Sequence, residues 1–142
     1  NLLVEQIRKY KPEVIVTHDF DGEYGNNQHK VTAWAVAKAV TLAQDPQYHP
    51  ASCEEYGTWE VKKLYVHLYK ENAIYMDWDK PLAAYDGRTG LEMATVGFNM
   101  HYMIQDDYTI NYGRKYDFTM FGLYYTAVGP DRDKNDFFEN ID

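Results

Sequence analysis

One stretch near the start of the chain, residues 14–43 (VIVTHDFDGEYGNNQHKVTAWAVAKAVTLA), constrains the fold more than any other. Residues 14–17 are apolar and β-branched, which predicts a buried strand of a parallel sheet. Residues 18–28 are rich in Gly, Asp and Asn and predict a loop. Residues 29–44 are apolar around most of a helical circumference, which predicts a largely buried helix. This order is typical of an α/β fold, in which sites lie beyond the carboxyl ends of the strands.

The rest of the sequence adds elements of both kinds. Helices are predicted where apolar residues recur at helical spacing, and strands where they alternate or are β-branched. The complete protein should therefore have a Rossmann-like, three-layer α/β fold with a mostly parallel sheet, represented here by its later part. The predicted elements are helices over 2–9 and 91–105, strands over 61–69 and 73–77, an irregular segment over 51–57, and a strand or ordered coil over 116–128.

Composition excludes several classes of function. The net charge of -8 disfavours nucleic-acid binding, which needs clustered Lys and Arg. The longest apolar candidate, residues 31–43, is interrupted by polar residues too soon to span a bilayer, so no transmembrane segment is predicted. Cys53 is a single cysteine and excludes an intrachain disulfide. The 14 Tyr, 6 Phe and 3 Trp suit a sugar-binding surface, although a Tyr-rich core and rim is the simpler interpretation.

The first residues, NLLVEQIRKY, include no initiator Met and no signal-peptide pattern. They read as the end of a helix. We therefore expect residues 1–142 to be the C-terminal portion of a single domain, whose upstream part is a partner that this chain needs.

The turn before the long helix carries the candidate chemistry. Gly22 and Gly25 allow a sharp backbone turn, and Asn26 and Asn27 are suitable helix N-caps. His29 then falls in the first helical turn, on its inward face. An isolated histidine at such a place is commonly a core residue bonded to a carbonyl group; the alternative is a metal ligand.

The same turn resembles the motif of the PIG-L/LmbE-like zinc de-N-acetylases, which remove acetyl groups from N-acetylglucosamine-type sugars. That family has a strand ending near Thr-x-Asp, then Gly-(Gly/Glu)-Tyr-Gly-His-x-(Asp/Gln)-His and an Ala/Val-rich helix. The resemblance is specific over about thirty residues and weaker over residues 92–105. The residues that carry it are Thr17, Asp19, Gly22, Glu23, Tyr24, Gly25, Asn26, Gln28 and His29, with Ala33, Val36, Ala37 and Ala39 in the helix.

The resemblance implies roles for some of the matching residues. His29 would be a zinc ligand, and Tyr24 would contact the acetamide or a sugar hydroxyl. Asn26 stands where the family usually has a histidine that stabilises the oxyanion; Asn can donate a hydrogen bond but cannot carry a proton. Asp19 and Glu23 are candidate substrate or supporting carboxylates, with simple solvation in the loop as the alternative.

The family's other two zinc ligands and its general base belong to a His-Pro-Asp-Asp-type motif, which this chain lacks. His49-Pro50 is followed by Ala51 and Ser52 and does not qualify. The remaining zinc ligands and the base are therefore expected upstream, and this chain alone should be inactive because one imidazole binds zinc weakly.

Other candidates are weaker. His101 and Gln105 share a helix face and could line a sugar pocket. His18 directly follows the first strand and could edge the site, whereas His67 is expected to be structural. The acidic tail, residues 131–142, has oxygen side chains at the spacing of a calcium loop but lacks its Gly, so a solvated tail is favoured.

Three functions follow. The leading one is a zinc-dependent hydrolase that deacetylates an amino sugar or its conjugate. The main alternative is a non-catalytic carbohydrate-binding relative of the same fold, in which the replacement of histidine by Asn26 would reflect the loss of catalytic activity. A third is an acidic, calcium-stabilised interaction domain, which requires calcium at Asp131, Asp133 and Asn135.

Overall fold

The computed structural model describes residues 1–23, 25–100 and 117–141. The chain divides into two compact units, one formed by residues 1–74 with 120–142 and the other by residues 75–119. No helix in the described ranges combines the length and apolar character that crossing a bilayer requires.

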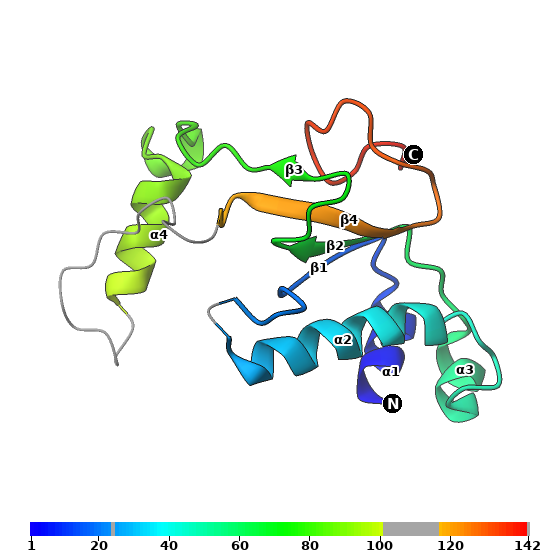
Figure 1. The fold of residues 1–142 in the computed structure, drawn as a ribbon. Helices are drawn as coiled ribbons and strands as arrows, with labels where there is room; N and C mark the ends of the chain where they lie inside the picture. The colour runs from blue at the N-terminus through cyan, green and yellow to red at the C-terminus, as the bar shows by residue number, and fades with distance from the viewer. Residues whose placement is uncertain (24, 101–116, 142) are drawn as a thin grey trace. The chain divides into compact units, whose positions relative to one another are not determined.

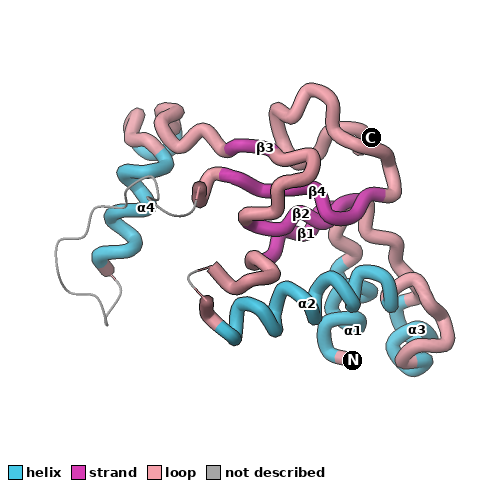
Figure 2. Tube along the Cα trace, viewed as in Figure 1, coloured by secondary structure: helices cyan, strands magenta, loops and turns pink. Residues whose placement is uncertain are grey.

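A four-stranded sheet has the order β1-β2-β4-β3 (Figures 1 and 2). The first three strands are β1 (Val14–Thr17), β2 (Lys63–His67) and β4 (Met120–Thr126), and β3 (Ile74–Tyr75) is a short fourth. β1 pairs in parallel with β2, so that their carboxyl ends lie at the same edge. β4 runs antiparallel to β2 and places Phe121 beside His67.

The α/β class is confirmed, but a mostly parallel sheet is not: the sheet of the described residues is mixed, with β1 and β2 parallel and β2 and β4 antiparallel. A parallel pair needs a crossover connection, and the helical segment between β1 and β2 supplies one. β4 arrives from residues 75–119 and runs back along β2, which makes that pair antiparallel. An apolar strand sequence does not encode strand direction, and β1, predicted to be buried, is only partly buried, with Val16 45% exposed.

Three helices cover one side of the sheet (Figure 1): α1 (Leu2–Tyr10), α2 (Asn27–Leu42) and α3 (Pro50–Tyr56). Their apolar residues pack on the β2 side chains that point to this side; the buried cluster is Val4, Ile7, Ala39, Val40, Ala43, Val61, Leu64 and Val66. The predicted irregular segment over 51–57 is instead α3. Pro50 opens this helix, where its fixed φ suits the first turn, and Gly57 ends it at φ 76°.

The other side of the sheet is covered by the C-terminal segment. Phe137 packs on the cluster formed by Tyr65, Ile74 and Leu123. Asp131 is buried and pairs with the buried Lys63 ammonium, while the Tyr65 hydroxyl donates to its other oxygen at 2.5 Å. The acidic tail is therefore not simply solvated as expected.

The tail residues at the calcium-loop spacing, the less favoured alternative, also make contacts within the chain. Both carboxylate oxygens of Asp131, the first loop position, are engaged by Lys63 and Tyr65. The Glu139 carboxylate, at the ninth loop position, accepts the backbone N–H groups of residues 132, 133 and 134.

The second unit contains α4 (Gly90–Asn99). Thr89 and Glu92 form a reciprocal capping box that begins this helix. The predicted helix over 91–105 is thus confirmed as far as Asn99, and residues 101–105 lie outside the described residues.

Candidate active site

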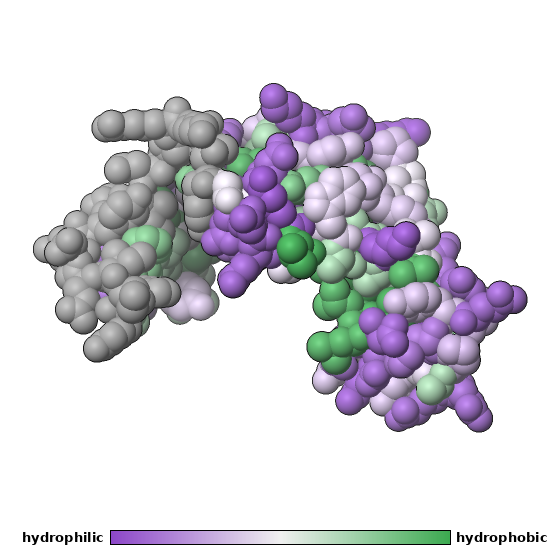
Figure 3. Space-filling model, turned by 60° about the horizontal axis from the view of Figure 1, so that its bottom comes forward, coloured by the Kyte–Doolittle hydropathy of each residue, from purple (hydrophilic) through white to green (hydrophobic). Residues whose placement is uncertain are grey.

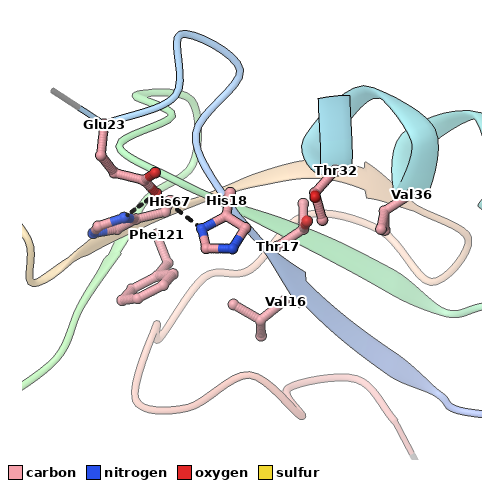
Figure 4. Close-up of a pocket in the computed structure, with 8 residues that line it drawn as sticks. All are labelled: Val16, Thr17, His18, Glu23, Thr32, Val36, His67 and Phe121. Carbon is pink, nitrogen blue, oxygen red and sulfur yellow. Dashed lines mark hydrogen bonds and ion pairs between the residues drawn. The ribbon is translucent and has the colours of Figure 1, made fainter. Parts of the chain in front are cut away.

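The site lies at the carboxyl ends of the parallel strands β1 and β2, where sequence analysis placed it. A cavity of about 370 Å³ opens there (Figure 4). β1 contributes Val16 and Thr17, and His18 follows it directly. The residues that line the cavity are Val16, Thr17, His18, Glu23, Thr32, Val36, His67 and Phe121.

The loop between β1 and α2 is folded so that Glu23 turns inward. Gly22 is buried with φ +79°, and a Cβ there would lie 2.2 Å from the Asn26 carbonyl oxygen. The Asp19 backbone N–H donates to Glu23 Oε1 at 3.1 Å, and the Glu23 N–H donates to Asp19 Oδ2 at 3.2 Å. This reciprocal pair closes the turn, and it requires a glycine at its tightest point.

The Glu23 carboxylate is the centre of the site. Its side chain is 5% exposed and lies among three imidazoles. Oε2 is 2.6 Å from His29 Nδ1, and Oε1 is 2.9 Å from His67 Nδ1 and 3.4 Å from His18 Nδ1. Figure 4 shows Glu23 between His67 and His18, at one end of the cavity.

These contacts decide the ionisation of Glu23. Burial of the carboxyl group acts to raise its pKa, but hydrogen bonds from His67, the Asp19 N–H and His29, with the nearby His18, outweigh burial and lower the pKa from 4.5 to about 2. Glu23 is therefore a buried carboxylate at neutral pH, and a carboxylate can only accept hydrogen bonds.

His29 sits in the first turn of α2, as predicted, and its ring stacks on that of His18 with centroids 4.1 Å apart. One ligand atom from each of His18, Glu23 and His29 lies within 4.8 Å of the others. Imidazole nitrogen and carboxylate oxygen are ligands that zinc accepts in catalytic sites. The donor set around His29 is thus chemically suited to zinc.

The structure places the other predicted site residues as follows. Asn26 is the N-cap of α2: its Oδ1 accepts from the backbone N–H of Gln28 at 2.9 Å and of His29 at 3.3 Å. Asp19 stabilises the loop through its contact with Glu23. Tyr24 and His101 lie outside the described residues.

Sequence reasoning missed one residue. His67 was expected to be structural, yet it lines the cavity and contacts Glu23. Glu23 was named as a substrate or supporting carboxylate with loop solvation as the alternative, and the structure shows that it is buried. One signal could have found His67: it ends the strand after the first helical crossover, and carboxyl ends of adjacent parallel strands meet at one edge. His18, expected at the edge of the site, does lie there.

Comparison with known proteins finds local similarity to deacetylases of one kind, each described as a 1D-myo-inositol 2-acetamido-2-deoxy-alpha-D-glucopyranoside deacetylase. The chain is 41% identical over 64 residues to that of Streptomyces avermitilis, a match covering 44% of this chain and 20% of the relative. It is 35% identical over 85 residues to deacetylase 1 of Frankia casuarinae, a match covering 57% of this chain and 27% of the relative. It is 38% identical over 72 residues to the Rhodococcus jostii protein, a match covering 51% of this chain and 23% of the relative.

The chain thus spans about a fifth to a quarter of the length of the curated relatives it matches. No family model matches it, and no solved structure matches it. The relatives are deacetylases of an inositol-linked amino sugar, and the similarity to them is partial and local.

Proposed function

We propose that this chain is the later part of a PIG-L/LmbE-like, zinc-dependent de-N-acetylase domain that acts on an amino sugar or its conjugate. The observation that carries the proposal is the position of His29. It opens a helix after a glycine-rich turn, at the carboxyl edge of a parallel strand pair, beside a buried carboxylate. The local similarity to inositol-linked amino-sugar deacetylases supports the same chemistry.

His29 would hold the zinc ion from this chain, with the remaining ligands and the general base supplied by residues upstream. Bound zinc polarises the amide carbonyl and lowers the pKa of a water molecule. An imidazole nitrogen of His29 is a ligand of the kind that zinc accepts in catalytic sites.

Other residues of the chain would handle the substrate. We assign substrate contacts to Asp19, Tyr24 and His101, as the family resemblance implies. Asn26 would donate from its side-chain amide to the oxyanion while its Oδ1 holds the helix N-terminus. Because an amide cannot carry a proton, turnover should be slower than with histidine at this position.

An upstream part of the protein would complete the Rossmann-like, three-layer arrangement. β1 lies at one end of the strand order, and Val16 in it is 45% exposed. Figure 3 shows apolar side chains exposed on one face of the molecule. On the helices that cover the sheet, Leu2 of α1 and Val31 of α2 are each 69% exposed. Exposed apolar surface of this kind marks a packing site for another part of a protein, and here we assign it to the segment that brings the missing ligands.

The test uses the full-length protein. Zinc content and release of acetate from inositol-linked and free N-acetylglucosamine are measured for the wild type and for His29→Ala. Loss of both zinc and activity is expected, whereas Gln28→Ala, an exposed change in the same helical turn, should leave both intact. Stoichiometric zinc that survives His29→Ala would contradict the ligand assignment.

One observation favours a second candidate, a carbohydrate-binding relative without catalysis. Trp34 is 55% and Tyr124 40% exposed, and both pack on Phe20 with centroids 4.3 and 4.8 Å from it. Partly exposed rings of this kind can stack on sugar faces. Zinc-replete protein that binds acetamido sugars without hydrolysing them would favour this function over the enzyme.

A further inference from the structure

Glu23 occupies its position against two physical costs. Its backbone has φ 30°, in the left-handed region that non-glycine residues seldom adopt, so this conformation is strained. Its carboxylate is almost completely buried, which also opposes folding unless the charge is compensated. The contacts of the carboxylate are what compensate these costs.

Those contacts fix where two protons lie. His29 Nδ1 is 2.6 Å from Oε2 and His67 Nδ1 is 2.9 Å from Oε1. Because a carboxylate only accepts hydrogen bonds, both Nδ1 atoms must donate and therefore carry a proton. In a neutral imidazole the lone pair is then on the other nitrogen, Nε2.

We propose that Glu23 is a positioning residue that holds His29 and His67 as Nδ1–H tautomers and thereby assigns Nε2 of His29 as the metal-binding nitrogen. The inference rests on the proposed function only in taking zinc as the metal. His18 assists, because its ring stacks on that of His29 at 4.1 Å and limits rotation of the imidazole.

A carboxylate behind a ligating histidine has known physical consequences. It fixes the tautomer and ring orientation and makes the ligating nitrogen more basic. Removing such a partner weakens metal binding about 10–100-fold without eliminating it. Loss of a direct ligand from a three-ligand site would be much larger, so the size of the effect distinguishes the two roles.

The first experiment needs no metal. Long-range ¹H–¹⁵N correlation NMR on the metal-free full-length protein reports which ring nitrogen of each histidine is protonated. We expect Nδ1–H for His29 and His67 in the wild type, a preference lost in Glu23→Gln and retained in Glu13→Gln, an exposed matched control. A wild-type His29 protonated only on Nε2 overturns the proposal, and this result does not depend on whether any variant folds.

The second experiment measures zinc affinity of the full-length protein by competition with a chelator. Glu23→Gln should weaken zinc binding about 10–100-fold, Glu23→Asp should recover part of the loss, and Glu13→Gln should have no effect. Unchanged affinity in Glu23→Gln, or complete loss of zinc from a folded variant, overturns the positioning role.

The two experiments separate the inference from the proposed function. A full-length protein with the expected tautomers and zinc affinities, but without deacetylation of any amino sugar, would refute the proposed function and leave the inference intact. Deacetylation with zinc bound, together with Nε2-protonated His29, would refute the inference and leave the function intact.

Discussion

Replacing Arg8 by Met should destabilise this protein more than any exposed substitution on α1. Arg8 is 0% exposed, and its guanidinium group lies where α2 ends and α3 begins. It donates to backbone carbonyl oxygens and to the Ser52 hydroxyl; the carbonyls belong to residues 42, 43, 45, 48 and 49, at 2.6–3.4 Å. No carboxylate contact to this guanidinium appears among the hydrogen bonds and ion pairs of the described residues.

The magnitude follows from this geometry. Four of the carbonyls belong to the end of α2 or the turn after it, where the helix dipole is negative and favours a cation. Each hydrogen bond to a charged group contributes about 1.5–3 kcal/mol before desolvation of the guanidinium is subtracted. Because Met would fill part of the space but leave several carbonyl oxygens without a donor, we expect a loss of about 3–5 kcal/mol. A small domain has a total stability of about 5–15 kcal/mol.

Urea unfolding followed by far-UV circular dichroism measures the difference. The stability of Arg8→Lys should lie between those of the wild type and Arg8→Met, since an ammonium group has three donors and cannot reach both helix ends as the planar guanidinium does. Lys9→Met, on the exposed side of the same helix, is the matched control and should change stability by less than about 0.5 kcal/mol. An Arg8→Met protein as stable as the wild type would refute the view that this cation joins α1, α2 and α3.

Three further outcomes are expected from unfolding measurements on the metal-free chain. Gly22→Ala should lower the free energy of unfolding by about 2 kcal/mol or more, because φ is +79° at this position and an added Cβ would lie 2.2 Å from a backbone atom. An unchanged free energy of unfolding would show that the loop relaxes freely. Asp131→Asn should lower the free energy of unfolding by about 3–5 kcal/mol because it leaves the buried Lys63 charge without its carboxylate. Asp133→Asn, at an exposed position, should leave the free energy of unfolding unchanged. Equal stability of the two variants would contradict the pairing of Asp131 with Lys63. Since the pKa of Glu23 is lowered to about 2, its ionisation stabilises the fold above pH 4.5, and that contribution, at most about 3 kcal/mol, is lost as the pH falls from 4.5 toward 2. The free energy of unfolding of Glu23→Gln should therefore decrease less than that of the wild type as the pH falls from 4.5 toward 2. Identical pH profiles of stability would refute this linkage.

Local patterns in the sequence determined the elements around the site. The β-branched run predicted β1 with the bounds that the structure has, and Asn26, the cap of α2, was one of two asparagines expected to cap that helix. The site was expected at the carboxyl end of β1, and His29 and His18 lie there. These features depend on neighbouring residues, through backbone propensity and capping, so sequence alone can specify them.

Tertiary structure decided which distant residues meet. β4 pairs antiparallel with β2, a direction that no local pattern in residues 120–126 encodes. His67 reaches Glu23 across 44 residues, and Lys63 reaches Asp131 across 68. In both cases a polar residue that looked structural or solvated is buried with a partner, because a buried charge is stable only when the fold brings its counterpart to it. The sequence by itself identified His29 and its turn; only the fold revealed that a buried carboxylate holds it.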